Sequence, residues 1–168
     1  RVPTSDAPTV VELDWRLSPE VLAGSEFPVL LGVAQTGVGV DRLADFLCEI
    51  GPSPADRPTA ARLGKEETEI VADPTGTPAA YVFSTVADPF VGQLSLFKVL
   101  SGTIKAEDHL VNATSGTEER LHGLFHLRGK EHLPTDTVVA GDIAAVAKLN
   151  GSPTGSVLCA RAVPSVPG

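Results

Sequence analysis

A four-residue motif in the middle of the sequence has the residue types of a nucleotide-binding site. Asp73-Pro74-Thr75-Gly76 fits the D-x-x-G pattern that GTPases place near magnesium. Such a site also needs a G-x-x-x-x-G-K-[ST] loop to hold the phosphates, and the sequence contains neither this loop nor an N-K-x-D motif. We therefore interpret the motif as a proline turn between strands. We expect this chain to bind no nucleoside triphosphate by itself.

Histidines form a second candidate group. His122 and His126 are four residues apart, and His109 and His132 lie nearby in the sequence. The pair falls in a segment with strand character, where this spacing shares a face but separates the side chains by about 13 Å. A zinc site is an alternative, but no cysteine lies at ligand spacing. We favour exposed or hydrogen-bonded histidines and predict no metal site.

Paired carboxylates are a third candidate, because general acid and base catalysis often uses two of them. The sequence contains Glu66-Glu67 and Glu118-Glu119. Neighbouring side chains of a strand point to opposite faces, so Glu118 and Glu119 should not form a dyad, and we expect both pairs to be solvated. Nothing resembles a nucleophile elbow either. We predict no catalytic residue and do not expect a stand-alone enzyme; whether a longer parent is an enzyme stays open.

The elements around these candidates have the pattern of short strands. Residues 92–100 alternate, with Leu94 and Leu96 on one face and Phe97 and Val99 on the other. Strands are predicted at 68–72, 79–86, 93–100, 109–113, 118–127, 143–149 and 156–161, with weaker extended pairing at 130–134. Short strands at this density favour a mainly β fold with a closed or nearly closed barrel.

The first third of the chain has a different pattern. Residues 28–34 form a short apolar run typical of a buried strand, apolar residues from Val40 to Ile50 recur at helical spacing, and residues 10–15 are a candidate for a further strand. We predict a small α/β remnant (one strand, one helix) at 1–50, a linker at 51–68, the barrel at 69–163 and an exit linker at 164–168. Because the chain begins at Arg1 and contains no Met, we expect an internal piece of a longer protein.

Charge and composition limit the partners of the chain. The net charge is −8, which disfavours binding to the phosphates of nucleic acid over a large surface, and we expect no DNA binding. No apolar run approaches the roughly 20 residues of a membrane span, so we expect no membrane contact. Cys48 and Cys159 fit no metal spacing, and two isolated thiols favour a reducing, cytoplasmic location. We expect the chain to be monomeric.

Four stretches of the strand-rich half carry a family resemblance. They are ADPFVGQLSLFKVLSGTIKAED (87–108), NATSG followed by EERL (112–121), AGDIAAVAKL (140–149) and TGSVLC (154–159). Together they resemble the second domain of bacterial elongation factor G, the translational GTPase that drives ribosomal translocation. The resemblance implies a Greek-key barrel of the translation-factor second-domain type, which follows a GTPase domain and touches the small ribosomal subunit.

Residues 28–54 resemble the last strand, the last helix and the exit linker of that family's GTPase domain. The resemblance places Gly32, Val33 and Ala34 at the loop that helps to recognise guanine, where the family usually has Gly-Ser-Ala. It implies GTP or GDP with magnesium as the cofactor of the parent, and no cofactor in this chain.

The resemblance also implies a surface that faces small-subunit ribosomal RNA. Its residues in this sequence are Arg120, Lys98, Gln93, Ser115, Thr117 and Glu118. The family commonly has Lys or Arg near the last three positions and often Arg at Gln93, and the loss of these bases suggests an elongation factor G-like paralogue. Losing phosphate-neutralising side chains should weaken RNA binding and flatten its salt dependence.

The sequence therefore predicts a piece of an elongation factor G-like protein that acts in ribosomal translocation, with the ribosome as its partner. One alternative is the barrel of a ribosomal-protection or release-type translational GTPase. Another is a non-ribosomal protein-binding module, which the net charge of −8 favours.

Overall fold

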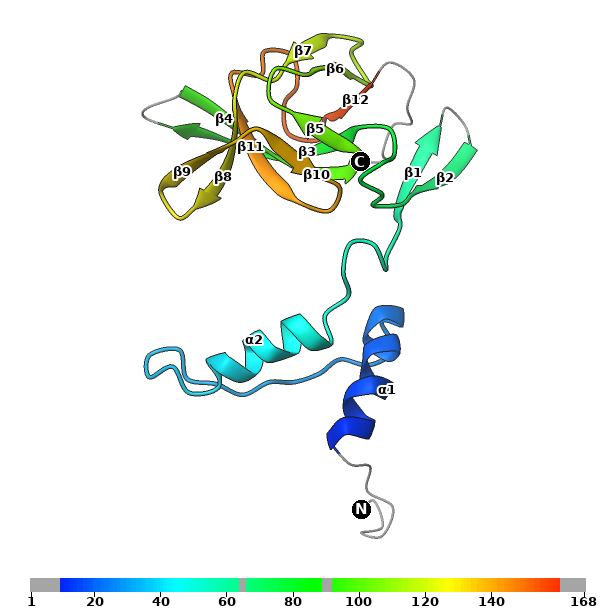
Figure 1. Cartoon of the computed structure of the whole chain (residues 1–168), viewed down its shortest axis with the longest axis vertical. Helices are drawn as coiled ribbons and strands as arrows, with labels where there is room; N and C mark the ends of the chain where they lie inside the picture. Colours follow the sequence, from blue (N-terminus) through cyan, green and yellow to red (C-terminus); the bar gives the residue numbers. More distant parts are fainter. Residues whose placement is uncertain (1–9, 64–65, 89–91, 161–168) are drawn as a thin grey trace. The chain divides into compact units, whose positions relative to one another are not determined.

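The computed structural model describes residues 10–63, 66–88 and 92–160 of the chain. The chain divides into two compact units that span 1–57 and 58–168 (Figure 1). The first unit contains helices α1 (Val10–Ala23) and α2 (Val40–Glu49), and the second contains the strands.

Helix α1 replaces the strand that residues 10–15 suggested, so that prediction is wrong. The helical pattern becomes clear only over a longer window, in which Leu13, Leu17 and Val21 recur every four residues. Pro19, inside the helix, obscures this pattern, because proline removes a backbone hydrogen bond and is more typical of a helix start. No described helix is long and apolar enough to cross a membrane.

The apolar run at 28–34 belongs to no strand, which corrects the predicted strand of the α/β remnant. A strand needs a neighbour for its backbone hydrogen bonds. Among the described residues of this unit, only the isolated Val33–Val38 bridge supplies one. The predicted helix is confirmed as α2, after which the Gly51 N–H donates to the Phe46 carbonyl oxygen.

The second unit is an antiparallel β-barrel, which confirms the predicted fold class. Its strands are β1 (Thr59–Leu63), β2 (Glu66–Ile70), β3 (Ala79–Asp88), β4 (Gly92–Ser101), β5 (Thr103–Lys105), β6 (His109–Asn112), β7 (Glu118–Arg120), β8 (Leu124–Arg128), β9 (Glu131–Thr135), β10 (Thr137–Val139), β11 (Ile143–Ala147) and β12 (Val157–Cys159). Eight of them form one sheet in the order β7-β6-β12-β3-β4-β11-β8-β9, while β1 pairs with β2 and β5 with β10. Because β12 and β11 insert between earlier strands, the order is not sequential, as in a Greek key.

The core of the barrel follows the alternation of its strands. On β4, Phe97 and Val99 lie in the main core, whereas Leu94 belongs to a smaller buried cluster against which Leu96 packs. The predicted division of these four side chains between two faces is confirmed. Phe97 is 1% exposed and is among the largest fully buried side chains of the barrel.

Three segments of the second unit differ from the predicted elements. Residues 59–63 and 66–68, which we assigned to the linker, lie in strands β1 and β2, where Ala61 and Ile70 are buried. The single strand predicted at 118–127 is two strands, β7 and β8, because Gly123 between them has a φ of 76° that a strand does not accommodate. The weak pairing predicted at 130–134 is a full strand, β9.

The large sheet ends in strands β7 and β9. Strand β7 has three residues, two of which are the charged and exposed Glu118 and Arg120. Strand β9 contains Pro134, which has no backbone N–H to offer a further strand.

Candidate functional site

The D-x-x-G motif is a structural turn, as predicted. Asp73 Oδ1 accepts the Thr75 N–H and the Thr75 hydroxyl, both at 2.8 Å, and these bonds lower the pKa of the Asp73 carboxyl. The Asp73 carbonyl oxygen accepts N–H groups from Gly76 and Gly102. A Cβ on Gly102 would lie 2.6 Å from the Pro78 nitrogen, so this glycine is required where the turn meets the end of β4. The motif therefore joins two turns of the barrel.

The four histidines are each paired with a carboxylate rather than with one another. His122 lies in the loop between β7 and β8 and His126 lies in β8, so the two do not share one strand. The pairs are His109–Glu118 at 3.1 Å, His122–Glu107 at 3.6 Å, His126–Asp142 at 3.8 Å and His132–Asp88 at 3.4 Å. Within the described ranges, no three metal-ligating side chains gather into a possible metal site.

Gly32, Val33 and Ala34 line a hollow of about 250 Å³ in the first unit. The Val33 N–H donates to the Val38 carbonyl oxygen at 2.8 Å, and the Val33 carbonyl oxygen accepts the Gly37 N–H at 3.0 Å. These bonds hold the residues in a tight loop. The structure thus places the three predicted guanine-side residues beside an apolar hollow that Leu43 of α2 also lines.

The β6–β7 hairpin gathers four of the six residues that were predicted to face RNA: Ser115, Thr117, Glu118 and Arg120. All four are exposed. Arg120 Nη2 lies 2.7 Å from Glu107 Oε2, and Glu118 pairs with His109. The cation of the hairpin is therefore matched by a carboxylate on the barrel.

Gln93 and Lys98 lie on β4, which β12 and β3 separate from β6 in the sheet. Gln93 is exposed and Lys98 is partly buried between Tyr81 and Ile143 on the neighbouring strands. The structure does not bring these two residues into the hairpin.

Glu119 is a residue whose role sequence reasoning missed. Predicted to be solvated with Glu118, it is 4% exposed and hydrogen-bonded, so that prediction is wrong for Glu119. The predicted opposite orientation of the two side chains is confirmed, since Glu118 is exposed. Glu119 pairs with the buried Leu110 across the hairpin, and this alternation was the signal that would have placed it inside.

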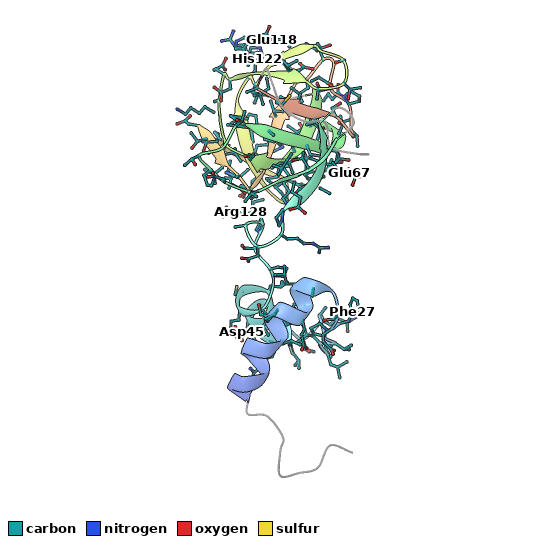
Figure 2. The ribbon with its side chains drawn as sticks, turned by 90° about the vertical axis from the view of Figure 1, so that its right-hand side faces the viewer. Phe27, Asp45, Glu67, Glu118, His122 and Arg128 are labelled. Carbon is teal, nitrogen blue, oxygen red and sulfur yellow. The ribbon has the colours of Figure 1, made fainter. Side chains whose placement is uncertain are left out.

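The carboxylate of Glu119 binds one segment of the chain, Asn150 to Ser152. Oε1 accepts the Gly151 N–H at 2.7 Å and the Ser152 hydroxyl at 2.9 Å, and Oε2 accepts the Asn150 N–H at 3.3 Å. Figure 2 shows Glu118 and His122 at the same end of the barrel, with Arg128 at the opposite end. The hairpin and the segment that Glu119 binds thus belong to one polar end of the barrel.

The fold defines a class of protein, namely an antiparallel β-barrel domain. A family profile described as Elongation factor G domain 2 matches residues 77–160. The chain therefore belongs to the elongation factor G domain 2 family. The matched residues are the segment on which the sequence resemblance rests, and the predicted resemblance is confirmed.

A solved structure with a similar fold is the crystal structure of ttk003000868 from Thermus thermophilus. Its sequence is 28% identical, and the two structures superpose with a TM-score of 0.71 over 95% of this chain. The chain spans 22% of the length of that protein, or about a fifth. The similarity therefore extends beyond the barrel into the first unit.

Proposed function

We propose that the chain is part of a translational GTPase of the elongation factor G type. In this proposal the barrel couples the GTPase domain to the small ribosomal subunit during translocation. The observation that supports it best is the family match over strands β3 to β12 of the barrel, residues 77–160. This chain spans 22% of the similar protein from Thermus thermophilus, and this supports a longer parent protein.

The proposed cofactor of the parent is GTP or GDP with magnesium, held mainly by residues outside this sequence. Gly32, Val33 and Ala34 would contribute to the guanine side, because they line an apolar hollow of about 250 Å³. The sequence contains no G-x-x-x-x-G-K-[ST] loop, so in this proposal the phosphates bind to residues outside it.

Calorimetry tests whether nucleotide binding requires the residues outside this sequence. We expect no heat of binding when GTP or GDP is added at micromolar concentration to residues 1–168, and clear binding to the full-length protein. Micromolar binding to residues 1–168 alone would show that the guanine-side loop is a complete site, contrary to the proposal.

The ribosomal role is tested by co-sedimentation of the full-length protein with small subunits and with whole ribosomes. We expect binding to both, stronger with a non-hydrolysable GTP analogue than without nucleotide. A full-length protein that stays in the supernatant at low salt in every nucleotide state would refute the ribosomal function.

A non-ribosomal protein-binding module is the second candidate. The net charge of −8 and the Glu107 carboxylate beside Arg120 favour it, because they reduce the attraction to phosphates. The same sedimentation experiment separates the two functions, since this candidate predicts no ribosome binding at any salt concentration.

A further inference from the structure

Strands β3 and β9 meet although three strands separate them in the large sheet. Strands β4, β11 and β8 lie between them, so in a flat sheet the two strands would be about 19 Å apart. Yet Nε2 of His132 on β9 lies 3.4 Å from Oδ2 of Asp88 at the end of β3. In Figure 1 the β8–β9 hairpin and the start of β4 project from the same side of the barrel. The sheet therefore curls until β9 reaches the end of the β3–β4 hairpin.

Asp88 points to the face of the sheet that carries the smaller buried cluster. It is paired with Gly92 at the end of the β3–β4 hairpin, and Leu94 follows two residues later on β4. Because paired residues share a face, and so do strand residues two apart, Asp88 and Leu94 lie on the same side of the sheet. The smaller cluster consists of Leu94, Ala145 and Ala147, which are not part of the main core of the barrel.

His132 points to the same face of the sheet. It is paired with Leu127 on β8, and Phe125, two residues before Leu127, is paired with Ala145 of the smaller cluster. The ring centroids of Phe125 and His132 lie 5.9 Å apart. Since Asp88 and His132 both project from this face and meet, the sheet curls over the smaller cluster. This curl explains why the members of the cluster are at most 7% exposed although they lie outside the main core.

Only the base of the β8–β9 hairpin belongs to the ladder of the barrel. In the described sheet, β8 pairs with β11 through Leu124 and Phe125, and β9 pairs with β8 alone. Residues 126–134 therefore project beyond the last ladder pair. A hollow of about 260 Å³ opens where β8 leaves β11. It is lined by Leu96, His126, Leu127, Ile143 and Ala144.

Two histidines attach the projecting part of the hairpin to the barrel. Nδ1 of His126 lies 3.3 Å from the Ile143 carbonyl oxygen, and its Nε2 lies 3.8 Å from Asp142 Oδ2. The side chains of His132 and Asp88 are 21% and 15% exposed, less than in any other histidine–carboxylate pair of the described residues. A polar contact that is shielded from water is stronger than an exposed one. The His132–Asp88 contact is therefore the main attachment.

We propose that residues 126–134 form a lid over the smaller cluster, held closed by the His132–Asp88 contact. The lid moves where β8 leaves β11, because Leu124 is anchored in the main core and Gly123 before it has a φ of 76°. Opening breaks only the contacts of the projecting residues, so it occurs while the main core stays folded. It exposes the apolar side chains of the smaller cluster. This inference concerns the barrel itself and does not depend on the ribosomal function.

Amide hydrogen exchange of residues 1–168 tests the contact that holds the lid closed. The variants are Asp88→Ala, His132→Phe, which keeps a ring against Phe125, and the double substitution. We expect each single substitution to speed exchange of the lid amides about fivefold, as the loss of one hydrogen bond does. The double variant should exchange no faster than the faster single variant, since both substitutions remove the same contact. Unchanged exchange in Asp88→Ala, or single effects that multiply in the double variant, would overturn the proposal.

Two comparisons separate opening of the lid from a general loss of stability. The His109–Glu118 pair has the same chemistry at 3.1 Å, but it is exposed and joins the adjacent strands β6 and β7. The variant with His109→Phe and Glu118→Ala should leave exchange of the lid amides unchanged. The Val82 amide, whose N–H donates to the Ser156 carbonyl oxygen, should exchange as slowly in all variants as in the wild type. If it accelerates as much as the lid amides, the barrel opens as a whole and the lid does not exist.

A thiol placed in the smaller cluster tests whether the lid uncovers it. Ala145→Cys introduces the thiol at a fully buried position, Cys48→Ser removes the exposed thiol, and the buried Cys159 reports opening of the whole barrel. We expect the introduced thiol to react with a soluble disulfide reagent faster than Cys159. Adding Asp88→Ala should accelerate the introduced thiol about fivefold further and leave Cys159 unchanged. If both thiols react at the same rate, the cluster is exposed only on global unfolding and the proposal is wrong.

Discussion

Adding positive charge to the β6–β7 hairpin should strengthen ribosome binding in a salt-dependent way. The change is the triple substitution Ser115→Lys, Thr117→Lys and Glu118→Lys in the full-length protein. All three side chains are exposed at or next to the hairpin tip, so the lysines can extend into solvent without entering the core. The substitution replaces a neutral or acidic surface with one that can neutralise phosphates.

The number of added lysines sets the expected change in salt dependence, and the structure sets the expected loss of stability. Three new phosphate contacts should make the slope of log affinity against log salt steeper by about two to three units. Over a fourfold change in salt this amounts to an additional change of about 16- to 64-fold in affinity. The substitution removes the contact between Glu118 and His109, whose side chains are 62% and 57% exposed. A pair this exposed contributes at most about 1 kcal/mol.

The assay is equilibrium binding to small subunits from low to moderate salt, with the melting temperature as a control for folding. The matched variant places lysines at Glu131, Thr137 and Val139, which are exposed on β9 and β10 and give the same change of formal charge. Like Glu118, Glu131 leaves an exposed ion pair, here with Arg128. If the hairpin variant shows no more gain in affinity or salt slope than the matched variant, the hairpin is not the docking surface.

Further predictions concern the barrel and its stability. Deleting residues 1–57 should leave the calorimetric melting transition of the second unit nearly unchanged, and loss of that transition would show that the first unit is integral to the fold. Ser95→Ala should raise the free energy of unfolding in urea by about 1 kcal/mol, because the fully buried hydroxyl has no hydrogen-bond partner in the described structure; a loss of stability would reveal one. Phe97→Ala, by contrast, should lower that free energy by about 3–5 kcal/mol, and a loss below about 1 kcal/mol would contradict the packing described for β4. Asp73→Ala should melt at a lower temperature than the wild type at pH 7, because the ionised Asp73 carboxylate accepts two hydrogen bonds from Thr75. These bonds lower the pKa of Asp73 from its usual 3.8, so the difference in melting temperature should disappear as the pH falls below that value and the carboxylate is protonated. A difference that persists at pH 2 would exclude this cause.

The sequence predicted those parts of the fold that depend on local signals. Strand β4 was found to within one residue at each end, because its side chains alternate and a Ser-Gly turn follows it. Strands β5 and β10 were missed, since each has three residues and neither has a recognisable pattern. They form because Ile104 and Val138 are buried opposite each other, more than 30 residues apart in the sequence.

In the candidate site too, the sequence predicted local elements but not the contacts between distant residues. The hairpin could be predicted, because a family resemblance marks it and a turn defines it. The hydrogen-bond partners of Glu119 could not, since they begin at Asn150, which no local signal connects with Glu119. Likewise, residues 28–34 have the composition of a strand, but composition does not supply the neighbouring strand that would complete it.

The two ends of the large sheet bear on how the protein behaves at high concentration. Open sheet ends recruit strands from other molecules when they are long, flat and apolar. Here one end is the three-residue β7 with two charged side chains, and the other, β9, is interrupted by Pro134. In the first unit, however, Phe27, Val29 and Leu31 are each more than 80% exposed, in a segment that belongs to no helix or strand. Self-association of the isolated chain would therefore start from its first unit, and the barrel would stay dispersed once that segment is removed or covered.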